Sequence, residues 1–420
     1  MNKKWLVFGL FVLAGMVITF TSTASQAQTE LTPIEQLGMN LYFDEDLSEP
    51  SGQSCASCHD PAFGFVDPDK GLPVSEGVIL GLFGGRNSPS AAYAMYAPIR
   101  YFDVTEGLWI GGQFWDSRAT GEVLGDPLAD QAIGPFLNEV EMANTSEAQV
   151  VAKVAASDYA GLFEQVWGPN AFADVYAAYD NIGLSIAAFE RTELFAPFTS
   201  KYDYYLQQCL NMGGDMDNCA KGIGKTARKA GKYLFSKEEW YGLQIFMGEN
   251  NNDGILEKGE GAMCAACHVA DWTEDPGNVF VPDWAPEGWV PPVFTDFTYD
   301  NLGIPKNTAY PLDPNAPVDL GLGAVGLDLA ENGKFKVMTL RNVGLTAPYG
   351  HNGFFLRLKD ITHFYNTRDV PGSLQKGADW PAPEYPATMN MDELGSLGLS
   401  DADEDALVEF MKTLTDGWTP

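Results

Sequence analysis

The sequence predicts a mainly α-helical protein with two similar units in tandem and long ordered loops. Three observations support this prediction. The motif Cys-x-x-Cys-His occurs twice, at residues 55–59 and 264–268. Each copy follows a segment with a helix-capping signal and apolar residues at helical spacing, at 32–43 and 236–247. The remaining sequence is rich in Gly, Pro and aromatic residues and contains few alternating strand patterns.

Residues 1–27 have the pattern of an export signal. Lys3 and Lys4 form a basic start, residues 5–20 are apolar, and residues 25–27 place small side chains at a cleavage position. We therefore expect cleavage after position 27 and a soluble mature protein in the periplasm. An uncleaved anchor is the alternative, although the apolar run is short for a membrane span.

The first predicted helix starts at Thr32, which can serve as N-cap, with Pro33 at the first helical position and Glu35 closing a capping box. Ser236 and Glu239 repeat this arrangement before the second motif. Each capped helix is followed by a loop and then by Cys-x-x-Cys-His, which indicates a diverged internal repeat.

A third capped helix is predicted near the C-terminus. Ser400 precedes an apolar stripe that runs from position 407 to position 414. We expect an N-terminal unit at 28–225 and a C-terminal unit at 226–420, joined near 221–235. This basic, Gly-containing stretch stands out in an acidic chain.

The 420-residue chain has a formal net charge of −32. This acidity argues against nucleic acid as a partner, because phosphate binding requires a surplus of Lys and Arg. The acidity is consistent with simple solubility, and it is also consistent with electrostatic steering of a positively charged partner protein.

Two of the six cysteines, Cys209 and Cys219, lie outside the repeated motif. In an oxidising compartment, a disulfide that closes this Gly-rich loop is the simplest interpretation. Two free thiols or a pair of metal ligands are the alternatives.

The repeated motif indicates covalent haem. Two cysteines three residues apart can each form a thioether to a haem vinyl group, and the adjacent His can reach the iron. A zinc or disulfide site would explain a single copy, but two copies behind capped helices favour haem. We therefore expect two c-type cytochrome-like domains in tandem, with two haem c groups on Cys55, Cys58 and His59 and on Cys264, Cys267 and His268.

Four further segments lie in order around the two motifs. They are GGRNSPS at 84–90, QFWDSRA at 113–119, GPFLNEVEM at 134–142 and TLRNVGLTAPYGHNG at 339–353. With the motifs, they resemble the bacterial di-haem cytochrome c peroxidases and their MauG-type relatives over nearly the whole mature chain. The resemblance implies that peroxide reacts at the N-terminal haem and that the C-terminal haem transfers electrons.

The resemblance also implies the second iron ligands. In the peroxidases the C-terminal haem usually carries a Met, and in MauG-type proteins a Tyr. The matching position, fourteen residues after His351, is Tyr365. A packed aromatic is the alternative for Tyr365, and Met338 is the second candidate ligand. The loop at 69–87, which carries a blocking His in many relatives, contains no histidine here, so we expect the first haem to be open, or closed only by water or a weak ligand.

Peroxide cleavage needs proton transfer and hydrogen-bond donation near the iron. The family uses a Gln before Phe-Trp-Asp, which matches Gln113, and a Glu about ten residues later. Because of an insertion, the Glu position falls on Ala129. Glu122 and Asp130 are nearby carboxylates that could substitute, or they could be solvated loop acids. The family's bridging Trp has no clear match; Phe102 and Trp109 lie in that region.

Two calcium sites are predicted. The family's interdomain site uses an Asn side chain and backbone carbonyls, which match Asn87, Thr346 and Pro348. Separately, the segment 249–260 resembles an EF-hand loop, with a turn at Gly254. Its six candidate ligands are Glu249, Asn251, Asp253, Ile255, Glu257 and Glu260. A polar loop without metal is the alternative for this segment.

Three functions are consistent with the sequence. The first is a di-haem peroxidase that reduces hydrogen peroxide with electrons from a small cytochrome or copper protein. The second is a MauG-type enzyme that oxidises a side chain of a partner protein. The third is a non-catalytic electron carrier, which predicts that both irons have two protein ligands. Homodimerisation is a further expectation from the resemblance, and His363 has no assigned role.

Overall fold

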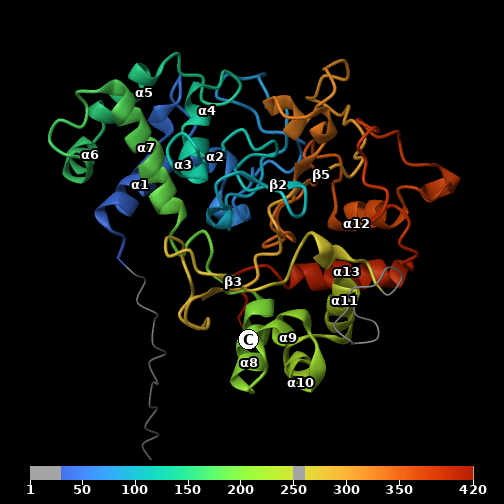
Figure 1. Ribbon diagram of the computed structural model, residues 1–420. Coiled ribbons are helices and arrows are strands. Elements are labelled where there is room, and N and C mark those ends of the chain that lie inside the picture. The colour runs from blue at the N-terminus through green and yellow to red at the C-terminus, as the bar shows by residue number, and fades with distance from the viewer. Residues whose placement is uncertain (1–29, 249–260, 420) are drawn as a thin grey trace, which may run out of the picture. The chain divides into compact units, whose positions relative to one another are not determined.

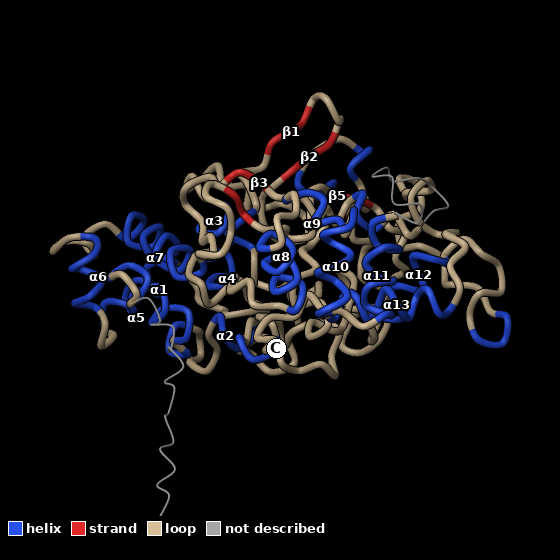
Figure 2. The backbone as a smooth tube through the Cα atoms, turned by 90° about the horizontal axis from the view of Figure 1, so that it is seen from below, coloured by secondary structure: helices blue, strands red, loops and turns tan. Residues whose placement is uncertain are grey.

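The computed structural model describes residues 30–248 and 261–419. The predicted export signal and the predicted EF-hand loop at 249–260 lie outside the described residues. Residues Thr32–Pro420 form one compact unit. Helices dominate this unit and strands are few and short, whereas much of the remaining chain runs in loops (Figures 1 and 2). The prediction of a mainly α-helical fold with long loops is therefore confirmed.

The α-helices of the described residues are α1 (Pro33–Phe43), α2 (Cys55–Cys58), α3 (Pro127–Ala132), α4 (Gly134–Leu137), α5 (Glu147–Ala156), α6 (Ala160–Trp167), α7 (Val175–Glu190), α8 (Lys201–Asn211), α9 (Met216–Lys221), α10 (Gly224–Leu234), α11 (Lys237–Met247), α12 (Leu358–Thr367) and α13 (Asp401–Lys412). Short 3-10 helices occupy Glu45–Leu47, Pro61–Phe63, Ala94–Tyr96, Cys264–Ala266, Leu322–Val325, Leu329–Glu331 and Gln375–Gly377. In this part of the chain no helix is long and apolar enough to cross a membrane.

Within residues 30–248 and 261–419 the strands form three antiparallel two-stranded sheets. They pair β1 (Tyr101–Asp103) with β2 (Leu108–Ile110), β3 (Thr273–Glu274) with β4 (Trp289–Val290), and β5 (Tyr299–Asp300) with β6 (Phe335–Lys336). The β1–β2 hairpin pairs Phe102 with Trp109, and their ring centroids lie 5.3 Å apart.

The capping predictions are confirmed. The backbone N–H of Thr32 donates to Glu35 Oε2 at 2.7 Å at the start of α1. The backbone N–H of Ser236 donates to Glu239 Oε2 at 2.6 Å at the start of α11. Ser400 begins α13 in the same way, with its side-chain oxygen accepting from the third helical residue. These bonds satisfy backbone donors that the first helical turn leaves free.

The two motif-preceding helices also pack in the same way. A Cβ at Gly38 of α1 would lie 1.9 Å from the carbonyl oxygen of Ser185 in α7. A Cβ at Gly242 of α11 would lie 2.0 Å from the carbonyl oxygen of Ala406 in α13. Only glycine permits such close contact between helix backbones. Each pair therefore crosses at a glycine, at the same distance from the N-cap of its first helix.

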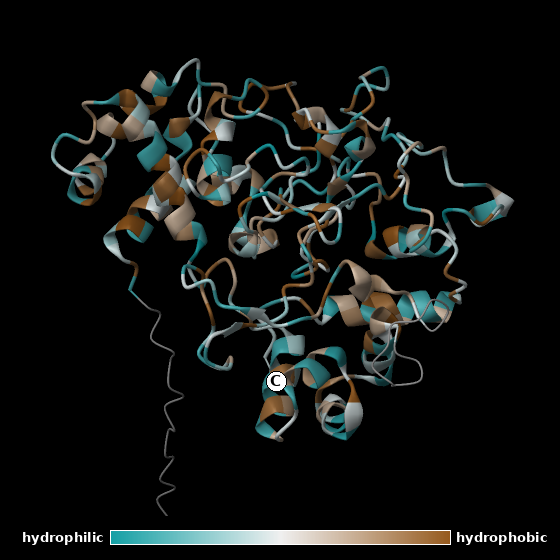
Figure 3. Cartoon of the chain, viewed as in Figure 1, coloured by the Kyte–Doolittle hydropathy of each residue, from teal (hydrophilic) through white to brown (hydrophobic). Residues whose placement is uncertain are grey.

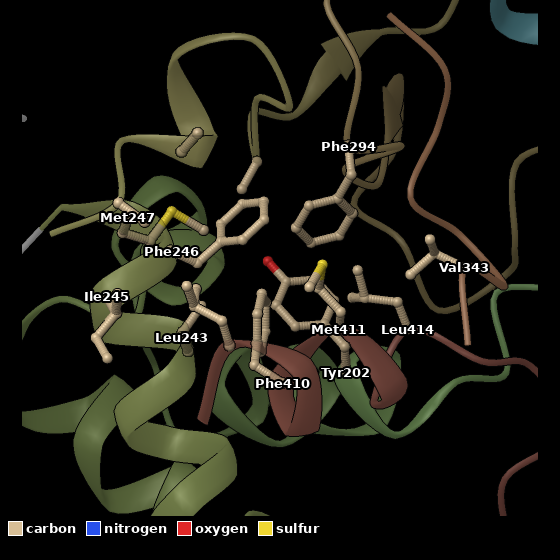
Figure 4. Close-up of a cluster of buried hydrophobic side chains, with 14 of the residues drawn as sticks. Tyr202, Leu243, Ile245, Phe246, Met247, Phe294, Val343, Phe410, Met411 and Leu414 are labelled. Atoms are coloured by element: carbon tan, nitrogen blue, oxygen red, sulfur yellow. The ribbon is translucent and has the colours of Figure 1, made fainter. Parts of the chain in front are cut away.

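The core around α11 and α13 is aromatic. Figure 4 shows Phe246, Phe294, Phe410 and Tyr202 directed toward one another. The ring centroids of Phe246 and Phe410 lie 5.2 Å apart, and those of Tyr202 and Phe294 lie 5.0 Å apart. Along α13, hydrophobic and hydrophilic residues both occur, as expected for a helix with one buried face (Figure 3). This core joins α8, α11 and α13 beside the second motif.

The predicted disulfide is confirmed: Cys209 and Cys219 are bonded and link α8 to α9. The basic stretch at 221–235, where a joint between units is expected, contains helix α10, whose residues Ala227 and Ala230 are buried. The apolar spacing of these small residues accounts for the helix, because it gives α10 a face that packs against α8.

Candidate active site

The first Cys-x-x-Cys-His motif forms α2, and His59 directly follows it. His59 Nδ1 lies 3.1 Å from the carbonyl oxygen of Phe65. The Tyr42 hydroxyl donates to the carbonyl oxygen of His59 at 2.8 Å and fixes the backbone there. Burial lowers the pKa of His59, which favours a neutral imidazole. With Nδ1 donating to a carbonyl, Nε2 carries the lone pair that an iron needs.

The second motif repeats this geometry without an α-helix. Cys264 begins a 3-10 turn, and His268 Nδ1 lies 3.1 Å from the carbonyl oxygen of Phe294. Burial lowers the pKa of His268 to about 4, so its imidazole is neutral at physiological pH. Burial also raises the pKa of the Cys264 thiol to about 12, as expected for thiols enclosed in an apolar site.

A cavity of about 230 Å³ lies at the second motif. Cys264, Cys267 and His268 line it, together with Tyr365 and Met338. Its other walls come from segments far apart in sequence, including residues 87–90 beside the first motif and 333–351. The motif cysteines and histidine therefore face a cavity, which leaves room for a covalently attached group.

Both candidates for the second iron ligand line this cavity. Tyr365 lies on α12, and burial raises the pKa of its hydroxyl. Tyr365 is half-buried and lines the cavity, and among the described residues no hydrogen bond to its hydroxyl is found. Met338, the second candidate, approaches His268 through its backbone. A metal ion at the cavity would give the Tyr365 oxygen a partner.

Gln113 is buried, and both ends of its side-chain amide have partners. Its Nε2 donates to the carbonyl oxygen of Ala94 at 2.7 Å. Its Oε1 accepts from Nζ of Lys336 at 3.3 Å. Because both contacts come from other segments of the chain, the amide is held in one orientation.

Asp130 and Glu122, the two candidate catalytic carboxylates, have different surroundings. The carboxylate of Asp130 accepts from the backbone N–H groups of Gly121 at 2.7 Å and Leu124 at 2.8 Å. Asp130 therefore anchors the inserted loop to α3. Glu122 is an exposed residue of that loop, and Ala129 is fully buried. The structure does not bring either carboxylate into contact with Gln113.

The three residues of the predicted interdomain calcium site lie together. Asn87, Thr346 and Pro348 line one small pocket, which Asp67 and Asp69 also line. Asn87 Nδ2 donates to the carbonyl oxygen of Pro73 at 3.1 Å, which leaves its Oδ1 to accept. Oxygen donors of this kind suit Ca²⁺.

The remaining two histidines have different surroundings: His363 is half-buried and hydrogen-bonded, whereas His351 is buried and stacks on an aromatic ring. His363 Nδ1 lies 2.8 Å from Glu404 Oε1 and its Nε2 lies 3.2 Å from the carbonyl oxygen of Ser373, so it joins α12 to α13. His351 lines the cavity and stacks on Phe335, with ring centroids 3.6 Å apart.

Lys336 and Trp115 are cavity residues that the sequence analysis did not single out. Trp115 Nε1 donates to the carbonyl oxygen of Asn87 at 2.8 Å, which links the 113–119 segment to the small pocket at Asn87. The sequence does contain a pattern that could have identified Lys336: it is a lysine within the largely apolar run FKVMTL, which indicates a buried charge. Glu190 was also missed: it is buried near the first motif, and burial raises its pKa to about 8.

These observations fit haem at both motifs. Each histidine is half-buried, has a lowered pKa and is oriented through Nδ1, and the cavity at the second motif is also lined by a candidate oxygen ligand and a candidate sulfur ligand. The fold and the two sites thus define a di-haem c-type cytochrome.

Comparison with known proteins agrees. Residues 33–210 match the family described as di-haem cytochrome c peroxidase. The chain is 34% identical to methylamine utilization protein MauG of Paracoccus denitrificans, over 96% of this chain and 93% of that protein. It is 28% identical to cytochrome c551 peroxidase of Pseudomonas aeruginosa, over 77% of this chain and 69% of that protein. The chain belongs to the di-haem cytochrome c peroxidase and MauG family.

A solved structure supports the fold. The diheme peroxidase BthA of Burkholderia thailandensis superposes with a TM-score of 0.70 at 29% identity, covering 93% of this chain and 90% of that one. The resemblance predicted from the sequence motifs is therefore confirmed, and with it the assignment of the chain to an oxidoreductase family with two haem c groups.

Proposed function

We propose that this protein is a periplasmic peroxidase that reduces hydrogen peroxide to water with electrons from a small cytochrome or copper protein. The observation that carries the proposal is the fixed, buried amide of Gln113, in the segment that the resemblance assigns to the peroxide side. When bound, haem supplies the redox chemistry, which consumes two electrons and two protons for each peroxide. Gln113 is proposed to bind and orient the peroxide.

The proposed architecture is a tandem of two cytochrome-like domains, at 28–225 and 226–420, after an export signal at 1–27. The matching glycine crossings of α1 with α7 and of α11 with α13 support an internal repeat. So does the matching contact of each motif histidine with a backbone carbonyl.

Tyr365 is the proposed second ligand of the haem at Cys264 and Cys267. Two observations support it: the hydroxyl shares the cavity with His268, and it lacks a protein partner among the described residues. Calcium is proposed at Asn87, Thr346 and Pro348, whose shared pocket supports the site. A second calcium is proposed in the EF-hand-like loop on sequence grounds.

A second candidate function is MauG-type oxidation of a partner protein's side chain. Tyr365 favours it, because an anionic oxygen ligand stabilises oxidised iron. The buried Ala129, at the position of the family's distal Glu, also favours it, because a missing proton-transfer group would slow peroxide turnover.

Low-temperature EPR of the diferric protein, followed by stoichiometric peroxide, tests these functions. The peroxidase predicts one high-spin and one low-spin ferric signal and a rapid return to the ferric state only when a reduced donor is supplied. A spectral change that persists for minutes would favour the MauG-type function. Two low-spin signals that do not change on peroxide addition, even after partial reduction, would contradict both enzyme functions and favour the non-catalytic electron carrier.

A further inference from the structure

Lys336 is a buried lysine whose protein contacts are all neutral. Its side chain, at the end of β6, belongs to a residue that is 5% exposed. Nζ donates to the carbonyl oxygen of Gly112 and lies 3.3 Å from Gln113 Oε1. The ring of Phe297 lies 5.6 Å away. Among residues 30–248 and 261–419, no carboxylate oxygen lies within 4.0 Å of this ammonium.

Two nearby basic residues, unlike Lys336, have carboxylate partners. Lys334, two residues earlier, pairs with Glu331 at 3.0 Å. Arg341, which lines the same cavity, pairs with Asp203 at 2.8 Å. Burying a charge without an opposite charge is costly, and folded proteins normally pair such groups. The missing partner of Lys336 therefore requires an explanation.

The position of Lys336 supplies that explanation. Lys336 lines the cavity at the second motif. Among the described residues that line this cavity, Lys336 and Arg341 are the Lys and Arg residues. Since Arg341 is already paired with Asp203, Lys336 is the cation left to meet an anionic group of the cavity's occupant. Haem carries two propionate carboxylates, so the proposed occupant has the required chemistry.

We infer that the Lys336 ammonium is the counter-charge for a carboxylate of the haem at Cys264 and Cys267, and that it also holds the amide of Gln113. Lys336 is thus a positioning residue that connects the electron-transfer site to the peroxide side. The inference rests on the proposed function, because it requires haem in this cavity.

Two consequences follow from this arrangement. A positive charge beside a haem stabilises the reduced state, so its removal lowers the reduction potential. Loss of the ammonium also frees the carbonyl end of Gln113. Replacing Gln113 itself should affect peroxide turnover but leave the potential of the second haem nearly unchanged, because the amide is uncharged.

The experiment is an EPR-monitored redox titration of the holoprotein, in which each ferric haem has its own signal. The variants are Lys336→Met, Lys336→Arg and Lys336→Gln, with Lys334→Met as the matched control two residues away. We expect Lys336→Met and Lys336→Gln to shift the oxidised-to-reduced ratio of the second haem roughly tenfold at a given potential, about 59 mV for one electron. Lys336→Arg should keep most of the wild-type value.

An unchanged potential in both neutral variants, or an equal shift in Lys334→Met, would overturn the inference. If Lys336→Met does not assemble, Lys336→Gln gives the same loss of charge in a side chain that can still donate to Gly112. Haem content is measured first, by the mass of the denatured wild-type chain. Fewer than two covalent haems would defeat the proposed function, whereas two haems with unshifted potentials would defeat only the role of Lys336.

Discussion

Arg341 and Asp203 form an ion pair in which neither side chain is exposed, with Arg341 Nη1 2.8 Å from Asp203 Oδ2. The guanidinium also donates to the carbonyl oxygen of Pro292 and lies 4.9 Å from the ring centroid of Phe198. The pair joins the 339–353 segment, which lines the cavity, to α8.

Breaking this pair should strongly destabilise the fold. In Asp203→Asn the Arg341 charge stays buried without an anion, and the expected loss is about 3–5 kcal/mol of unfolding free energy. Chemical denaturation of the holoprotein measures it. The control is Lys412→Gln, which removes an exposed pair with Glu409 and should change the stability by less than about 1 kcal/mol. If the two substitutions lower the free energy of unfolding equally, the buried pair contributes no more to stability than the exposed pair.

Tyr365→Phe should change the second haem specifically. Removal of the hydroxyl takes away the proposed oxygen ligand, so the low-spin ferric signal should be lost and the potential of that haem should rise. Tyr349→Phe is the matched control, because Tyr349 lines the same cavity and its hydroxyl donates to the carbonyl oxygen of Val343 at 2.8 Å. Retention of the low-spin signal in Tyr365→Phe would direct attention to Met338.

Gln113→Ala should lower peroxide turnover roughly 10²–10³-fold, the usual effect of removing one positioned hydrogen-bonding group. Reduction of the second haem by a small reductant should be unaffected. Stopped-flow measurement of both steps separates them, and Gln131→Ala on α3 is the control. Unchanged turnover in Gln113→Ala would remove the observation on which the peroxidase proposal depends.

Calcium removal should slow turnover, and added calcium should restore it. Asn87→Ala should reduce the calcium content of the purified chain by one equivalent, because it removes the side-chain oxygen of the site proposed at Asn87, Thr346 and Pro348. Asp253→Ala tests the EF-hand-like loop independently. Elemental analysis of the two variants and the wild type assigns each ion. Full calcium content in Asn87→Ala would contradict the interdomain site.

Glu190 should make stability depend on pH. Burial raises its pKa from an ordinary value of 4.5 to about 8. Between these values the folded state binds more protons at Glu190 than the unfolded state, so the contribution of Glu190 to stability is most favourable below pH 4.5 and falls as the pH rises toward 8. A tenfold difference in proton affinity between the folded and unfolded states corresponds to about 1.4 kcal/mol of unfolding free energy.

Denaturation of Glu190→Gln at several pH values checks this. Its stability should vary less between pH 5 and 8 than that of the wild type. Glu193→Gln, at an exposed position one turn later, should keep the wild-type profile. If both variants have the wild-type slope, the carboxyl of Glu190 is not the source of the dependence.

Local patterns in the sequence determined much of this protein. The capped helices, the haem motifs and the Cys209–Cys219 disulfide were predictable, because each depends on residues close together in the chain. Gln113 and Tyr365 were identified by resemblance of short segments. Local patterns marked 221–235 as a basic, Gly-containing stretch, whereas its packing against α8 as helix α10 depends on tertiary contacts.

Only the tertiary structure decided which distant residues meet. Asp130 was a candidate proton-transfer group, but the fold uses its carboxylate to hold the backbone of the 121–124 loop. Lys336 had no assigned role, yet the fold buries it against Gln113, which lies 223 residues earlier. Such contacts depend on long-range packing, which no local spacing encodes, and the free energy of burying a charge is set by everything that surrounds it.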